Sequence, residues 1–145
     1  MTQRIFVNLP VADLDRSKAF YAALGFVNEP RFTNERAAAM KLSDTILVML
    51  LRHEFWKTFT SKAIPDATQS AQVMLAISRD SREAVDEITE RAAANGGRAD
   101  CNPRQDHGFM YGRSFEDPDG HIWEPSWMDM EAAFGGSPAP VEAPE

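Results

Sequence analysis

The sequence contains a single cysteine, Cys101, and no long run of apolar residues. One cysteine cannot form an intrachain disulfide or a cysteine-cluster metal site. The longest apolar run is the short segment Ile46–Leu51, whereas a membrane-spanning helix needs about 20 such residues. The N-terminal segment also lacks the apolar core of a signal peptide, so we expect a cytoplasmic protein with no membrane partner.

Basic residues are scarce relative to acidic ones. The chain has 15 Lys and Arg against 22 Asp and Glu, which gives a net charge of −7 and a pI of about 4.9. A protein of this charge repels the phosphate backbone, which argues against nucleic-acid binding. With 145 residues, 43% hydrophobic and 26% charged, the chain has the size and composition of one globular domain.

The first half of the chain predicts a strand, a helix and further strands in that order. The odd positions of residues 5–11 are all apolar, which indicates a strand with one face on a core. Asp13 can cap a helix that ends at Gly25. After a loop, two short strands are expected at about 37–42 and 45–51.

The second half repeats this order. A strand is expected over Gln72–Ser78, followed by a helix that opens with the capping-box spacing of Asp80–Glu83 and ends at Gly96. Three strands are then expected, at about 98–102, 109–116 and 121–127. The segment Asp117-Pro-Asp-Gly120 is a strong turn signal between the last two strands.

Each half therefore has the order β-α-β-β-β, and the chain is expected to be an α+β tandem repeat. We expect one domain over residues 1–130, with modules at about 4–52 and 72–128 and a linker at 53–71. Residues 131–145 are rich in Pro, Ala and Glu and bury too little apolar surface to offset their ordering entropy, which predicts a disordered tail.

Two motifs carry a resemblance to a known family. The first is Asp-Leu-x-x-Ser-x-x-Phe-Tyr at Asp13–Tyr21, and the second is Asp-Pro-Asp-Gly-x-x-x-Glu at Asp117–Glu124. Over residues 4–128 the chain resembles the vicinal oxygen chelate superfamily, which includes glyoxalase I, bleomycin- and fosfomycin-resistance proteins and extradiol dioxygenases. The resemblance implies tandem βαβββ modules that form one cleft, usually completed in a homodimer.

The resemblance also implies four positions that hold a divalent metal in many members of the family. Together with the internal repeat, it places them at Phe6, Val48, Met74 and Glu124. Three of the four are apolar, and a divalent ion needs three or more nitrogen or oxygen donors. We therefore expect no metal and no other cofactor.

Glu124 is the first candidate functional residue. If Asp117–Gly120 is counted as a four-residue hairpin turn, Glu124 faces Arg113 across the ladder, with Tyr111 on the same side. The pair could orient a ligand or supply acid–base chemistry at the floor of the cleft. It could equally be a structural ion pair.

Without a metal, Phe6, Val48 and Met74 are expected to line an apolar cleft for a ligand, and three further residues are considered as ligand contacts. Asn8 shares the expected cleft face with Phe6, and Trp56 lies in an aromatic segment that could close over a ligand or pack on a dimer partner. His107 lies in a loop that could overhang the cleft, or it could have no role. His121 shares the parity of Trp123 and is expected to point away from the cleft.

Three functions remain open from the sequence. The first is a metal-free protein that binds a small organic molecule, similar to bleomycin-resistance proteins. The second is a metal-dependent lyase or isomerase resembling lactoylglutathione lyase, against which the apolar positions argue. The third is a metal-free enzyme with Glu124 as general base.

Overall fold

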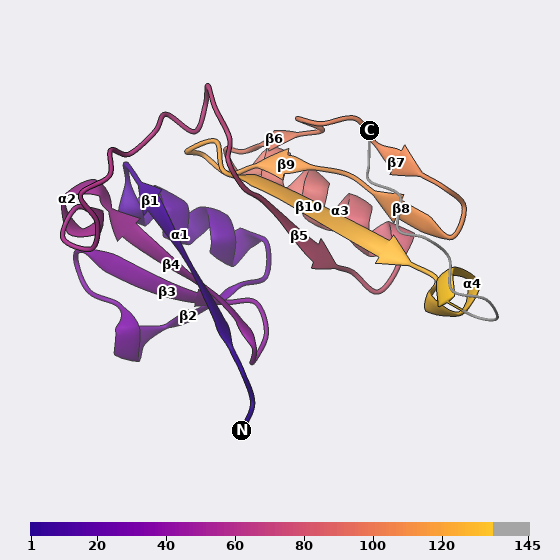
Figure 1. Ribbon diagram of the computed structural model, residues 1–145, viewed down its shortest axis with the longest axis horizontal. Helices are drawn as coiled ribbons and strands as arrows, with labels where there is room; N and C mark the ends of the chain where they lie inside the picture. The colour runs from indigo at the N-terminus through magenta and orange to yellow at the C-terminus, as the bar shows by residue number, and fades with distance from the viewer. Residues whose placement is uncertain (135–145) are drawn as a thin grey trace.

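The computed structural model describes residues 1–134 and consists of two βαβββ modules joined by a linker (Figure 1). Module 1 comprises β1 (Ile5–Val11), α1 (Leu14–Ala23), β2 (Val27–Glu29), a 3-10 turn (Pro30–Phe32), β3 (Ala37–Lys41) and β4 (Ile46–Arg52). The linker begins with the short helix α2 (His53–Trp56). Module 2 comprises β5 (Met74–Ser78), α3 (Arg82–Ala94), β6 (Arg98–Ala99), β7 (Gln105–Asp106), β8 (Met110–Gly112), β9 (Phe115–Glu116) and β10 (Ile122–Met128), and α4 (Met130–Phe134) follows it.

The two sheets share one topology, as the tandem repeat predicts. Sheet 1 has the order β1-β4-β3-β2, with β1 and β4 parallel. In sheet 2 the parallel pair is β5 and β10, and β10 then pairs with β8 and β9. The single strand expected at 109–116 is interrupted between β8 and β9. Pro125 lies opposite this interruption and has no N–H to donate to the ladder.

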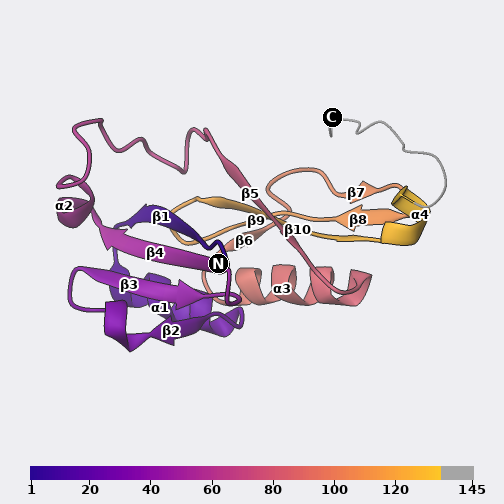
Figure 2. The same cartoon turned by 60° about the horizontal axis from the view of Figure 1, so that its bottom comes forward.

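Each sheet has one face in the core and one open face. Figure 2 shows α3 on one side of sheet 2 and the linker passing on the other side. From Val7 onward the residues of β1 alternate as predicted, because Leu9 and Val11 are buried and Val7 packs against the core. The prediction is wrong for Ile5, which begins the strand and is 57% exposed. One continuous core contains side chains of both modules, including Phe20, Val48 and Trp123.

The helix ends agree with the sequence at most positions. The Asp13 carboxylate caps α1 by accepting from the N–H of Arg16, and Gly25 ends the helix with a φ of 101°. The start of α3 differs, because Ser81 is its N-cap and accepts from the N–H of Ala84. The capping-box spacing therefore locates this helix start one residue too early.

The two motifs that carry the family resemblance contact each other. The Asp119 carboxylate accepts from the N–H of Ala12 at 2.9 Å and from the Ser17 hydroxyl at 3.2 Å. The Tyr21 hydroxyl donates to Asp117 at 2.6 Å and accepts from the indole N–H of Trp123 at 3.0 Å. The motifs thus join the 117–120 turn of module 2 to α1 of module 1, which is a structural role.

The C-terminal segment is helical at its start. Residues 131–134, assigned to the tail from the sequence, belong to α4, where Ala133 is buried and its N–H donates to the carbonyl of Asp129. The rest of the expected tail, 135–145, lies outside the described residues. Among residues 1–134, no helix is long and apolar enough to cross a membrane.

Candidate functional site

The last hairpin is one residue out of the expected register. Phe115 pairs with Trp123, and the N–H of Asp117 donates to the carbonyl of His121 at 3.0 Å. The loop inside that closing pair therefore has three residues, 118–120, where the prediction assumed four. Because successive strand residues point to opposite faces, this single step moves Arg113 away from Glu124. The prediction that Arg113 faces Glu124 is therefore wrong.

Arg113 instead lies on the α3 side of sheet 2, in an ion cluster. Its guanidinium, 5% exposed, donates to Asp100 at 3.0 and 2.8 Å, to Asp86 at 3.1 Å, and lies 2.8 Å from Glu90. Tyr111 is on the same face, and its hydroxyl donates to Asp86 at 2.6 Å.

These contacts favour the ionised forms of Asp86 and Asp100. The Arg113 hydrogen bonds lower the pKa of Asp100, and the Tyr111 hydroxyl and then Arg113 lower the pKa of Asp86. Tyr111 and Arg113 therefore attach α3 to the sheet and do not form the floor of a cleft.

Glu124 points to the open face of sheet 2 and is half-buried. Its closest polar partner is the side-chain amide of Asn102, which lies 3.5 Å from the carboxylate and 3.6 Å from the sulfur of Met74. The sequence places Glu124 and Met74 on one face correctly. It gives no signal for Asn102, because this residue lies in an irregular loop.

Val48 does not reach the open face of sheet 1. It is fully buried in the core, and it pairs with Val7 in the parallel ladder. The first hairpin also closes over three residues, since the N–H of Leu42 donates to the carbonyl of Ile46. When this closing pair is matched to the pair Asp117–His121 of the last hairpin, Glu124 aligns with Met49. The predicted alignment of Glu124 with Val48 is therefore wrong by one residue. The corrected position is again apolar.

The residues at the four corrected positions do not fit a divalent metal. Phe6, Met49, Met74 and Glu124 supply one carboxylate among three apolar side chains, and a divalent ion needs several nitrogen or oxygen donors. In the part of the chain that the structure describes, no group of three or more His, Cys, Asp or Glu side chains is arranged to hold a metal.

A groove of about 390 Å³ lies between the edge strands β1 and β5, beneath the linker. We call it the inter-module groove. Its apolar walls include Leu9, Val73, Leu75, Ile122 and the predicted aromatic Trp56. Its polar groups include the predicted Asn8 and three residues that the sequence did not single out as ligand contacts, Lys62, Gln72 and His121.

His121 lines this groove although strand parity points it away. It precedes β10, so the alternation of the strand does not determine its direction. A ring nitrogen lies 2.8 Å from the carbonyl oxygen of Pro10, which links the turn of module 2 to β1.

His107 lies apart from Glu124, in the loop between β7 and β8. A ring nitrogen is 3.2 Å from the Gln105 side chain. Arg82 donates to Asp106 at 3.0 Å and to the carbonyl of Gly108 at 2.9 Å, so the loop is tied to the start of α3. The expectation that His107 overhangs the cleft is not supported by these contacts.

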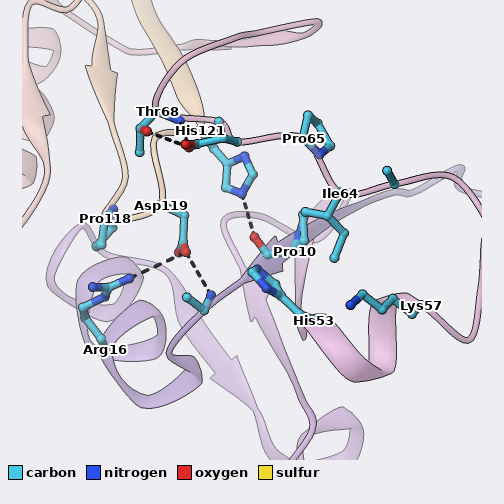
Figure 3. A pocket seen from close by; sticks show the side chains of 14 residues that line it. Pro10, Arg16, His53, Lys57, Ile64, Pro65, Thr68, Pro118, Asp119 and His121 are labelled. Carbon is cyan, nitrogen blue, oxygen red and sulfur yellow. Dashed lines mark hydrogen bonds and ion pairs between the residues drawn. The ribbon is translucent and has the colours of Figure 1, made fainter.

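A second, wider cavity of about 700 Å³ adjoins the groove (Figure 3). We call it the rim cavity. It lies between α1, α2, linker residues 63–68 and the 118–119 turn. Both cavities are lined by Pro10, His121 and linker residues Ala63, Pro65 and Ala67, so the linker runs between them.

Comparison with known proteins agrees with this architecture. Residues 3–41 match the family described as bleomycin resistance protein-like N-terminal. No curated protein matches the chain.

Solved structures resemble most of the chain. A hypothetical protein from S. aureus is 25% identical, with a TM-score of 0.72 over 88% of this chain and 95% of that chain. A glyoxalase/bleomycin resistance protein/dioxygenase family enzyme from Burkholderia phytofirmans is 17% identical, with a TM-score of 0.71 over 88% and 99%. A bleomycin resistance determinant encoded on the transposon Tn5 is 17% identical, with a TM-score of 0.61 over 88% and 99%. These likenesses show that the chain has the fold of the glyoxalase/bleomycin resistance/dioxygenase structures, and its first 41 residues contain the match to the bleomycin resistance protein-like N-terminal family.

Proposed function

We propose that this protein binds a small organic molecule in the inter-module groove, without a metal. The observation that carries the proposal is the groove itself. Its volume of about 390 Å³ falls in the range typical of ligand sites, and its walls are mainly apolar with a few polar side chains. Such a lining favours a ligand with an apolar body and a small number of hydrogen-bonding groups.

The polar groups stand at different parts of the lining. Asn8 comes from β1, Gln72 from the approach to β5, and Lys62 from the linker. A ligand in the groove would therefore contact both modules and the linker at once. Trp56, which is partly buried, supplies the largest apolar surface in this lining.

The open sheet faces support a second element of the proposal, a homodimer. Ile5, Phe6, Val73 and Met74 are all more than half exposed, at 57%, 52%, 63% and 55%. Apolar side chains clustered at two adjacent sheet edges favour cover by a protein surface. We propose that a second copy of the chain covers them, as the family resemblance implies.

Substitution of Trp56 tests the proposal. Small organic molecules are screened by thermal shift, and the best ligand is measured by calorimetry against the protein and against Trp56→Ala. Loss of an aromatic anchor should weaken binding by about tenfold or more. Phe59→Ala is the matched control, because Phe59 lies in the same segment, is 65% exposed and lines neither cavity. An equal loss of affinity in both variants, or a screen that finds no ligand, would contradict the proposal.

One observation favours a second candidate, a metal-free enzyme with Glu124 as general base. Glu124 has no cationic partner within the described residues, and the Asn102 amide is its one side-chain hydrogen bond there. Glu124 lines neither cavity, so this enzyme would hold its substrate on the open face of sheet 2. Glu124→Gln retains the shape and removes the base, so any turnover should fall by about 10²–10⁴-fold. Unchanged ligand binding with no turnover in either protein supports the binding function instead.

A further inference from the structure

The rim cavity brings basic side chains from separate elements to one space. Arg16 comes from α1, while His53 and Lys57 come from α2 and its C-terminal cap. His53 and Lys57 are four residues apart on one helical turn, and the N–H of Lys57 donates to the carbonyl of His53 at 3.0 Å. Their side chains therefore share a face. Figure 3 shows Arg16 at one end of the cavity beside Asp119, and Lys57 at the other end.

The acidic groups around this cavity are already bonded. Asp119 accepts from Ala12 and Ser17 and lies 3.6 Å from Arg16. Asp66 accepts from the N–H and hydroxyl of Thr68, at 2.9 and 2.6 Å, and Thr68 lies at the far end from Lys57 in Figure 3.

Arg16 has an acidic partner, Asp119, whereas His53 and Lys57 have none among the described residues. Within residues 1–134 neither makes an ion pair, and the nearest acid in their helix, Glu54, pairs with Arg52 at 3.0 Å. A chain with a net charge of −7 thus holds two nitrogen donors without an acidic partner on the wall of a cavity.

The neighbouring wall is apolar. Pro10, Ile64 and Pro65 line the cavity beside these donors (Figure 3). With a volume of about 700 Å³, the cavity is much larger than a simple ion. Its shape and lining suit a small molecule with an apolar body and an anionic head.

We propose that the rim cavity binds the phosphate or carboxylate group of a small organic anion through Lys57 and His53. This site does not rest on the ligand proposed for the inter-module groove, from which linker residues 63–67 separate it. Lys57 supplies a point charge and His53 a directional ring nitrogen. The apolar body packs on Ile64 and the two prolines.

Amide NMR titration at constant ionic strength tests this site. The probes are phenyl phosphate, benzoate and inorganic phosphate, with benzyl alcohol as the neutral control. Phenyl phosphate or benzoate should saturate, shift amides in α2 and residues 63–68, and bind more tightly than inorganic phosphate. Comparing the two organic probes identifies which anionic head the site prefers.

Two variants localise the binding. Lys57→Gln should weaken phenyl phosphate about tenfold, the effect expected for one charge-assisted hydrogen bond. Lys18→Gln on α1 is the matched control, because Lys18 lines neither cavity, and binding should be unchanged. Shifts that do not saturate, equal weakening in both variants, or equally tight benzyl alcohol binding would overturn the proposal.

Discussion

At the scale of single residues, the two charged groups expected to act together have separate environments. Arg113 is enclosed by three carboxylates beneath α3, whereas Glu124 lies on the open face near Asn102. The guanidinium is almost fully buried, and its partners are partly exposed, with side-chain exposures from 31% to 65%. Arg113 therefore contributes to stability, whereas Glu124 has no cationic partner among the described residues.

We predict that Arg113→Met destabilises the protein. The variant loses the buried hydrogen bonds of the guanidinium and leaves Asp86, Glu90 and Asp100 to repel each other. Because these carboxylates keep some contact with water, the free energy of unfolding should fall by about 3 kcal/mol, near the low end for a broken buried ion pair. Urea unfolding at neutral pH measures it.

Arg98→Met is the control for this prediction. Arg98 pairs with Glu116 at 3.0 Å, but its side chain is 66% exposed. An exposed ion pair should contribute less than about 1 kcal/mol. If the free energy of unfolding fell equally in the two variants, the cluster around Arg113 would stabilise the protein no more than an exposed ion pair does.

At the scale of elements, the 117–120 turn connects the modules. Asp117 is 3% exposed and accepts from Tyr21, Asp119 and His121. Burial raises the pKa of the Asp117 carboxyl in spite of these donors. Burial also raises the pKa of the Tyr21 hydroxyl well above its usual value, so this group stays protonated and continues to donate.

The raised pKa predicts a pH-dependent contribution to stability. The folded protein binds the Asp117 proton more tightly than the unfolded chain does. This contribution is full below about pH 4, the unfolded pKa, and is lost as the pH rises through the folded pKa. Asp117→Asn cannot titrate at this position. Its stability relative to the original protein should therefore increase as the pH rises from about 4 to 8.

Urea unfolding of both proteins across this range measures the difference. Asp86, Asp100 and Asp106 have lowered pKa values, with that of Asp106 at about 2, and their stabilisation is lost as the pH falls. They are present in both proteins, so their effect cancels in the difference. Gln3→Ala is the control, because Gln3 is exposed and has no titratable group, and it should give a curve parallel to that of the original protein. Parallel curves for Asp117→Asn as well would contradict the prediction.

At the scale of the whole molecule, the exposed apolar residues at the β1 and β5 edges lead to a prediction about assembly. Phe6→Arg places a charge on the surface proposed to meet a second copy, and a buried unpaired charge is costly. The variant should shift the protein from dimer to monomer in sedimentation equilibrium, with an unchanged far-UV spectrum.

Phe109→Arg serves as the matched control for assembly. Phe109 is 42% exposed, and its loop is tied to the start of α3 by Arg82. The variant should remain dimeric. A monomeric original protein, or dissociation of both variants, would show that the β1 and β5 edges are not covered by a second copy.

The sequence by itself determined the α+β repeat, because its signals are local. The apolar alternation of β1, the Asp13 cap and the turn at 117–120 each act within a few residues. The structure contains the cap, the turn and the alternation from Val7 to Val11. The sequence also predicts that three of the four metal positions implied by the family resemblance are apolar. This remains true after Met49 takes the place of Val48, because both side chains lack a nitrogen or oxygen donor.

Only the tertiary structure decided which side chains share a face and where a ligand could fit. A strand has a period of two residues, so a turn loop of three residues in place of four moves Arg113 and Tyr111 to the α3 side. The groove depends on how the linker crosses β1 and β5, and an irregular segment has no periodicity from which that path can be read. Lys62, Gln72 and Asn102 reach their sites from such segments, so no local sequence pattern places them there.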